Sequence, residues 1–293
     1  FEEVAALLWT AATSACGAGG PTVPYEEPAQ LVPNALGVYE LHFAPTEVTV
    51  DGKRYCVRGY NGHVPGPTIR VPAGTDRRIR VKLFNEFARP DFREIAGMEG
   101  YAEKSCHDFN LTNLHAHGAH VQPNYATALP YDPCMGDGCG PGGTYYGDNV
   151  LHEVSVGQTA QYRWDLDEDG THDPGTNWYH PHIHGSTAIQ VIGGATGALI
   201  VEGDLDKVPG IAGAKERVMV LNQLPIHSAQ TTPLPDGVAC SEATLSVNNF
   251  LTVSQDNPTL INGKLRPRIV TPPGQIERWR MIYSGTPDEM GMK

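Results

Sequence analysis

Short segments that alternate apolar and polar residues dominate the chain, and glycine, proline, asparagine or aspartate separates one from the next. The clearest pair is 47–50 and 55–60, with Asp51-Gly52 between them. An Asp-Gly pair between alternating segments is a strong signal for a tight β-hairpin. Other segments of this kind lie at 38–43, 69–71, 77–84, 109–117, 151–156, 160–166, 197–202, 217–221, 267–270 and 275–282. Because helical periodicity is nearly absent, the sequence predicts an all-β protein built as a sandwich or barrel.

A weak internal repeat suggests how the chain divides into domains. Residues 61–84 run from an Asn-Gly turn through a strand and a turn that contains proline and glycine to a second strand, and 262–282 repeat this order about 200 residues later. A length of 293 residues is enough for two ordinary domains. We expect an extended N-terminal leader over 1–34, a complete domain over 35–205, and an incomplete second domain over 206–293, since few residues follow the second copy of the repeat.

The charge of the chain narrows the classes of partner. The net charge is −12 at pH 7, and 18% of the residues are charged. This acidic balance argues against nucleic acid and against an anionic membrane surface as partners. It is compatible with cations or with neutral organic substrates, but it does not choose between them. No apolar stretch is long enough for a transmembrane helix, so we expect no membrane span.

Six cysteines point to disulfides rather than to a metal or redox motif. They are Cys16, Cys56, Cys106, Cys134, Cys139 and Cys240. No Cys-x-x-Cys occurs among them, which argues against a zinc ribbon or a thioredoxin-like site. The better interpretation is a protein exported to the periplasm or the extracellular space. Six cysteines allow many pairings, and only Cys134–Cys139 is suggested by its short loop.

Two groups of histidines at every second position carry the chemistry. One comprises His180, His182 and His184, and the other comprises His115 and His117. Twelve histidines in 293 residues give about 0.5 of a His-x-His pair by chance, whereas the chain has three. Imidazole binds copper, zinc, iron or nickel. Because no carboxylates are mixed into the pairs, calcium and magnesium are poor candidates.

The spacing of the histidines leaves two kinds of metal site open. In a strand, residues at i and i+2 emerge on the same face, with roots about 6–7 Å apart. Such a pair can give one ligand each to two adjacent metals, and two such strands would then hold a multinuclear cluster. A mononuclear zinc or copper site made from His180, His182 and one histidine of the first pair is the alternative.

Five stretches resemble the multicopper oxidase family, in particular its laccase-like members. They are 60–69, 114–118, 178–185, 197–202 and 277–282, within an overall resemblance over 38–283. The resemblance implies a cupredoxin-like Greek-key β-sandwich or barrel, with one complete domain and an incomplete second. It also implies copper as the cofactor and an oxidoreductase that couples one-electron oxidation of a phenolic or metal-ion substrate to the reduction of dioxygen to water.

The resemblance assigns a role to five residues. His115 corresponds to a ligand of the type 2 copper, and His117, His180 and His182 correspond to ligands of the type 3 pair. Asp148 lies where related enzymes place a carboxylate that donates protons. Without the resemblance, Asp148 is equally well interpreted as a turn residue that caps the next strand.

The sequence also departs from the family. The histidine motifs that complete the cluster are absent, and so is the His-Cys-His motif that also holds the type 1 copper. The chain is therefore expected to be the N-terminal part of such an oxidase, completed by missing C-terminal domains or a partner chain. The alternatives are a non-enzymatic copper-binding subunit or scaffold and the mononuclear enzyme described above.

The remaining residues near the motifs receive plainer interpretations. His184 lies on the right face for a third ligand, but the resemblance places this position behind the ligands. His63, His107, His120, His152, His172 and His227 are interpreted as turn or surface residues. Trp178 and Tyr179 are expected to pack around the cluster.

Overall fold

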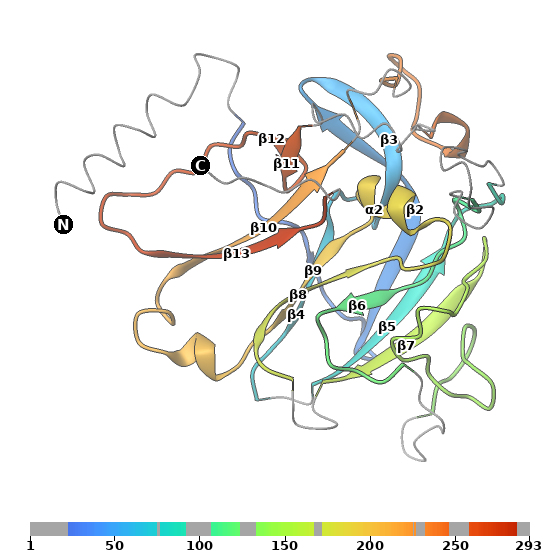
Figure 1. Ribbon diagram of the computed structural model, residues 1–293, viewed down its shortest axis with the longest axis horizontal. Helices are drawn as coiled ribbons and strands as arrows, with labels where there is room; N and C mark the ends of the chain where they lie inside the picture. Colours follow the sequence, from blue (N-terminus) through green and yellow to red (C-terminus); the bar gives the residue numbers. More distant parts are fainter. Residues whose placement is uncertain are drawn as a thin grey trace, which may run out of the picture.

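The computed structural model describes residues 23–74, 77–91, 107–123, 133–166, 172–224, 226, 232–245 and 258–285. Nearly all regular structure in these ranges is β-strand, which confirms the all-β prediction (Figure 1). The helical segments are α2 (Thr187–Ile192), η1 (Asp204–Lys207) and η2 (Glu242–Thr244). The strands are β1 (Gln30–Leu31), β2 (Val38–Val50), β3 (Lys53–Tyr60), β4 (Gly66–Val71), β5 (Arg78–Asn85), β6 (His115–His117), β7 (Thr159–Asp165), β8 (Gly175–His180), β9 (Gly197–Val201), β10 (Lys215–Gln223), β11 (Thr259–Ile261), β12 (Lys264–Leu265) and β13 (Glu277–Tyr283).

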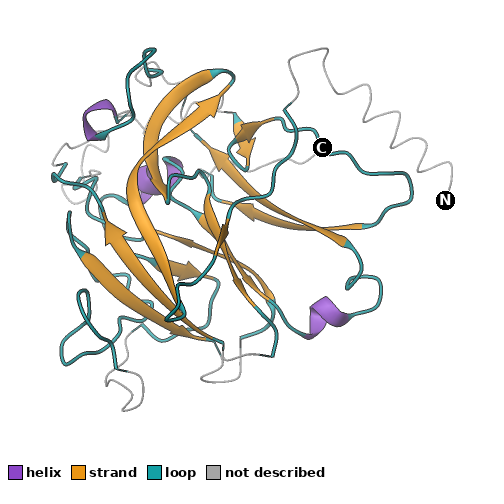
Figure 2. Ribbon diagram, turned by 180° about the vertical axis from the view of Figure 1, so that it is seen from behind, coloured by secondary structure: helices purple, strands orange, loops and turns teal. Residues whose placement is uncertain are grey.

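Two of the sheets form a sandwich around the main core (Figure 2). One sheet has the order β3-β2-β5-β7 and the other has the order β1-β4-β9-β8-β6. Fully buried side chains from both sheets form one apolar cluster, among them Phe43, Leu83 and Trp164 from the first and Ile69 and Leu199 from the second. Since successive side chains of a strand point to opposite faces, alternate residues supply this core, which explains why alternation in the sequence located the strands.

The first hairpin confirms the predicted turn but joins two segments that the sequence separated. Asp51 and Gly52 both have positive φ, 50° and 72°, as a two-residue turn with this handedness requires. The strand before it, β2, is continuous through Pro45, where the sequence predicted a break. Pro45 lies past Phe43, the last residue that pairs with β5, so its missing N–H breaks no hydrogen bond with that strand.

A third sheet repeats the pairing pattern of the first. Within it β10 is antiparallel to β11 and parallel to β13, just as β2 is antiparallel to β3 and parallel to β5. The turns that follow β3 and β11 also match, because Asn61-Gly62 and Asn262-Gly263 all have positive φ. The turn and the last strand of the sequence repeat thus have counterparts in both sheets. The expected strand 267–270, which corresponds to β4 in the first copy, is reduced to a single bridge between Arg268 and Pro24. The division at residues 205 and 206 stays a prediction.

Apolar and charged contacts hold the third sheet against the sandwich. Ala198 and Ile200 of β9 pack on Val218 and Val220 of β10 and on Ile282 of β13. Beside this cluster, charged side chains of both sheets and of the segment from Glu202 to η1 form a continuous network of ion pairs. Its members are Arg70, Glu202, Asp206, Glu216, Arg278 and Arg280.

Glu216 lies at the centre of this network. It accepts hydrogen bonds from Arg70, at 2.7 Å, and from Arg280, at 2.6 Å. Burial raises the pKa of the Glu216 carboxyl, but the two guanidinium groups lower it by more, so that its pKa lies below the ordinary value. The carboxylate is therefore charged and paired at neutral pH, as a partly buried charge must be.

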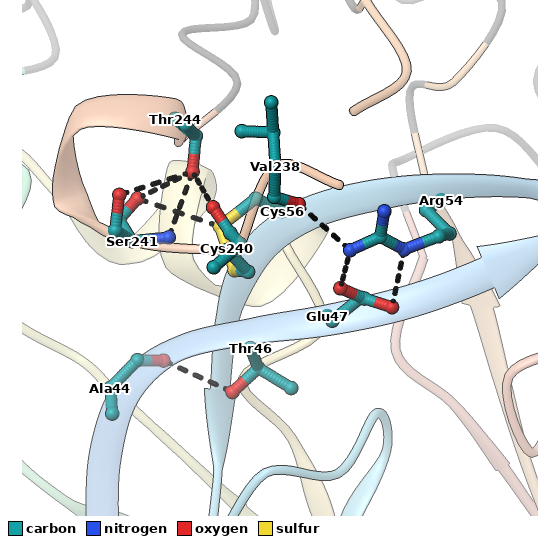
Figure 3. Close-up of a disulfide and its surroundings, with 10 residues drawn as sticks. Ala44, Thr46, Glu47, Arg54, Cys56, Val238, Cys240, Ser241 and Thr244 are labelled. Atoms are coloured by element: carbon teal, nitrogen blue, oxygen red, sulfur yellow. Dashed lines mark hydrogen bonds and ion pairs between the residues drawn. A yellow bond between two sulfur atoms is a disulfide. The ribbon is translucent and has the colours of Figure 1, made fainter. Parts of the chain in front are cut away.

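The structure contains two disulfides among the described residues. Cys134–Cys139 is the local bridge that the sequence suggested. The second, Cys56–Cys240, joins residues 184 positions apart. It was not predicted, because the sequence does not distinguish it from the other possible pairings of six cysteines. Figure 3 shows that Arg54, two residues before Cys56 on β3, reinforces this attachment by donating to the carbonyl of Val238 at 2.8 Å. Cys16 and Cys106 lie outside the described residues.

Several predicted segments are shorter than expected or differ in type. The expected strand 109–117 is reduced to β6, preceded by a single bridge from Thr112 to Val154. That bridge is also all that pairs in the segment 151–156. Of the expected leader, residues 23–34 include the short strand β1, and the rest lies outside the described residues. None of the helices in the described part of the chain has the length and apolarity that crossing a bilayer requires.

The short helix α2 follows the second histidine motif, where no helical periodicity is visible. With six residues it is too short to show a period of 3.6. Tertiary contacts hold it instead, since the fully buried Gln190 donates to the carbonyls of Phe109 and Leu111 at 2.9 and 2.6 Å. These bonds attach α2, which follows the second histidine motif, to the segment that precedes the first.

Candidate metal centre

Two adjacent antiparallel strands bring the histidine motifs side by side. β6 pairs with β8 so that His115 lies opposite His180 and His117 lies opposite Trp178. Figure 1 shows β6 at the edge of the five-stranded sheet, next to β8. His115 and His117 are the two end residues of β6, and His180 is the last residue of β8, so the backbones of these three histidines lie on paired strands of the sheet.

The imidazoles of this pair of strands converge on one point. The candidate ligand atoms of His115, His117 and His180 all lie within 4.8 Å of one another. His117 Nδ1 is 3.3 Å from His180 Nε2. Two nitrogens that share one ion at metal–nitrogen distances of about 2.0–2.1 Å lie roughly 3.3 Å apart in tetrahedral geometry. The spacing of these nitrogens therefore fits a metal ion between them.

His182 reaches the same place by a different route from the one expected. The sequence predicted one extended strand through His180 and His182, but β8 ends at His180. The next residue, Pro181, has no N–H and cannot extend the strand pairing. The ring of His182 nevertheless lies 5.1 Å from that of His115 and 5.8 Å from that of His180, measured between centroids. The prediction of a shared strand face is thus wrong for His182, although the four histidines do meet.

Asn113 holds His182 in this position. Its side-chain oxygen accepts a hydrogen bond from the backbone N–H of His182 at 2.6 Å, and its Nδ2 donates to the carbonyl of Val150 at 2.8 Å. The residue is fully buried. Sequence reasoning missed it, and the signal that was present is a polar residue directly before the apolar residue that opens the first histidine motif.

Asp148 contacts the first histidine directly. Its carboxylate lies 2.8 and 3.0 Å from Nδ1 of His115 and also accepts the backbone N–H of Ala116 at 2.8 Å. A carboxylate accepts hydrogen bonds, so Nδ1 of His115 carries the proton and Nε2 presents a lone pair. Asp148 therefore orients His115, whereas its expected role as proton donor stays a prediction.

A second hydrogen bond fixes the tautomer of His180. Its Nδ1 donates to the carbonyl of Pro181 at 2.7 Å, which leaves Nε2 unprotonated and facing His117. Burial, followed by the neighbouring imidazoles, lowers the pKa of His180 to about 3. Burial also lowers the pKa of His117. Both rings are therefore neutral at pH 7, which is the protonation state that metal binding requires.

The two aromatic residues before His180 take opposite directions. The ring of Trp178 stacks on His117 and His180, with centroids 4.6 and 4.2 Å away, so it packs against the cluster as predicted. Tyr179 is buried on the other face, and its hydroxyl donates to the carbonyl of Pro67 at 2.6 Å. Alternation along β8 explains why only one of the two reaches the histidines.

No family model matches this chain, but curated proteins resemble it. It is 24% identical over 240 residues to multicopper oxidase mco of Staphylococcus aureus, and the aligned region covers 80% of this chain and 39% of that protein. It is 23% identical over 236 residues to the protein of the same name from Staphylococcus haemolyticus. The chain thus spans about two fifths of the length of these curated relatives (39% of each).

Solved structures agree with the fold. A laccase from Pediococcus acidilactici superposes with a TM-score of 0.55 at 22% identity, covering 92% of this chain and 47% of that one. McoA, a multicopper oxidase of Aquifex aeolicus, superposes with a TM-score of 0.52 at 14% identity, covering 91% and 47%. These similarities confirm the predicted cupredoxin-like sandwich fold.

Proposed function

We propose, from the confirmed resemblance to part of a multicopper oxidase, that this chain is the N-terminal part of such an enzyme and supplies half of the ligands of its three-copper cluster. The single observation that carries the proposal is the convergence of nitrogens from His115, His117 and His180, on two paired strands, within 4.8 Å. Bound copper supplies the one-electron redox chemistry by which such an oxidase reduces dioxygen to water.

Each residue of the cluster has a distinct task in this proposal. His115 binds the type 2 copper through Nε2, because Asp148 occupies Nδ1. His117, His180 and His182 bind the type 3 pair. Asp148 keeps the proton on Nδ1 of His115 and is the carboxylate through which protons reach the cluster. Trp178 stacks on the rings of His117 and His180 and thereby holds them in orientation.

The rest of the enzyme is proposed to lie outside this chain. The missing ligands, the type 1 copper and the pocket for a phenolic or metal-ion substrate belong to C-terminal domains or to a partner chain. The repeated strand pairing supports a first cupredoxin domain over 35–205 and the start of a second over 206–293. The disulfide Cys56–Cys240 supports export to the periplasm or the extracellular space.

One observation favours a second candidate, a mononuclear site. Three imidazoles that converge within 4.8 Å are the ligand set of a three-histidine zinc or copper centre. This ligand set replaces the one expected from the sequence, which used His180, His182 and one histidine of the first pair. The two candidates therefore differ in His182, which the mononuclear site built from these three rings leaves unused. They also differ in the number of ions bound per cluster.

Copper analysis of purified variants tests the proposal. Wild type, His180→Ala and His182→Ala are loaded with copper, and the copper content per chain is compared, with His63→Ala as the matched control at an exposed histidine of a turn. Both cluster variants are expected to lose copper relative to wild type, and the control is not. Loss in His180→Ala but not in His182→Ala supports the mononuclear site instead, and unchanged copper in both variants refutes the ligand assignment.

The oxidase reaction requires its own test. Addition of a polypeptide that carries the remaining domains is expected to produce dioxygen consumption with a reducing substrate, measured with an oxygen electrode. His182→Ala is expected to abolish this consumption. A reconstituted complex that binds copper but consumes no oxygen would favour the non-enzymatic copper-binding subunit.

A further inference from the structure

The third histidine of the alternating run does not join the cluster but faces another histidine. The ring centroid of His184 lies 5.6 Å from that of His107, with 53° between the two planes. The two residues are held in register by the backbone, because the N–H of His107 donates to the carbonyl of Gly185 at 2.9 Å. A hydrogen bond between segments that are distant in sequence thus fixes the separation of the two rings.

Gly185 allows this close approach. Its φ of +87° lies in the left-handed region, and a Cβ atom there would lie 2.6 Å from Nε2 and from Cε1 of His107. Only a residue without a side chain lets the His107 ring rest directly against the backbone beside His184. The requirement for glycine at this position is therefore imposed by the histidine pair as well as by the turn.

The neighbouring carboxylate prepares His107 as a ligand. Asp108 lies 2.9 Å from Nδ1 of His107, which repeats the contact of 2.8 Å between Asp148 and His115. The proton is thereby placed on Nδ1, and Nε2 is left with its lone pair, as in most metal-binding histidines. Asp108 has a φ of +52°, an uncommon conformation outside glycine. About a third of each of these two side chains is exposed, so water has access to the ring.

The separation of the rings suits a shared ion. Two imidazoles bound to one metal at about 2.0–2.1 Å with a tetrahedral angle have centroids roughly 5.2 Å apart, and wider angles increase this separation. His117 and His180, whose nitrogens have the spacing of a shared ion, have centroids 5.5 Å apart, and the value of 5.6 Å for His107 and His184 is close to it.

We propose that His107 and His184 form a second metal site, separate from the cluster, that binds one copper or zinc ion with water as the remaining ligands. Asp108 is its positioning residue. Imidazole nitrogens select these ions over calcium and magnesium. With two protein ligands and open access to water, the site exchanges its ion faster than the cluster does. It does not depend on the proposed oxidase function, because none of its residues is a predicted cluster ligand.

Metal titration of a variant without the cluster tests this site. In the His115→Ala/His180→Ala background, Zn²⁺ and Cu²⁺ are titrated in competition with a chromophoric chelator. One equivalent is expected to bind, and further substitution by His107→Ala or His184→Ala is expected to abolish it. His63→Ala in the same background is the matched control and retains the equivalent. Asp108→Asn is expected to weaken binding by about 10- to 100-fold.

The outcomes distinguish this proposal from the oxidase proposal. If the background variant binds no ion, or if binding survives both His107→Ala and His184→Ala, the second site is refuted while the cluster is untouched. Circular dichroism checks that each variant folds. If the background variant does not fold, His184→Ala and His63→Ala are compared in the otherwise wild-type chain. Loss of one copper equivalent in His184→Ala alone then supports the site, and equal copper content in the two refutes it.

Discussion

The buried imidazole of His180 makes the stability of the metal-free protein depend on pH. Burial lowers the pKa of His180 from 6.5 to about 3, so the folded protein keeps the ring neutral where the unfolded chain protonates it. Below pH 6.5 the unfolded state therefore binds more protons, and stability is lost as pH falls from 6.5 towards 3. At pH 4.5, two units below the unfolded value, the loss is about 2.7 kcal/mol, and it reaches about 4 kcal/mol at pH 3, where the folded-state ring is itself half protonated.

Urea unfolding of the metal-free chain at pH 7.5 and pH 4.5 measures this effect. Comparison with His180→Gln isolates it, because glutamine does not titrate and groups elsewhere titrate alike in both proteins. The decrease in the free energy of unfolding between the two pH values is expected to be about 2.7 kcal/mol larger for wild type than for the variant. An equal decrease in the two proteins would show that His180 is not desolvated as the structure indicates.

Three further substitutions test the framework around the site. Replacement of Cys56 and Cys240 by serine opens a loop that spans 184 positions. In the chain-entropy description this lowers the free energy of unfolding by about 5 kcal/mol, which urea denaturation measures. An unchanged unfolding midpoint would contradict the bridge. Asn113→Ala removes two buried hydrogen bonds and is expected to lower the free energy of unfolding by about 1–3 kcal/mol. It is also expected to weaken copper binding, because His182 loses the contact that positions it. Full copper affinity in a chelator competition would count against this positioning role. Leu83→Ala, at a fully buried core position, is expected to cost about 2–5 kcal/mol by thermal or urea unfolding, and a cost below 1 kcal/mol would be inconsistent with the packing described.

Local signals in the sequence predicted much of the fold. The Asp51-Gly52 and Asn61-Gly62 pairs specify turns through their own φ preferences, and alternation specifies which face of a strand is buried. These signals act over a few residues, so they survive without knowledge of the rest of the molecule. Pro45 shows the limit of such reasoning, because whether a proline interrupts a strand depends on which side of the strand has a partner.

The sequence likewise predicted the histidines of the candidate site but not the residues that orient them. The four histidines were visible as residues at regular spacing, and the convergence of His115, His117 and His180 follows from the pairing of two strands. The positions of the residues that orient them were not visible. Asn113 acts on His182 across 69 positions, and a contact of that kind is created by the tertiary fold. The pairing Cys56–Cys240 was hidden for the same reason.

The indole of Trp178, which lies flat against two imidazoles of the cluster, gives the protein an internal optical probe of its metal content. A paramagnetic cupric ion bound to those rings would quench the emission of the adjacent indole, whereas zinc, with a filled d shell, would leave the emission largely intact. The chain has four tryptophans, of which Trp164 is enclosed in the apolar core and Trp279 is half exposed on β13. Copper-dependent quenching that is present in the wild type and absent in Trp178→Phe would therefore report copper binding at this one centre in solution.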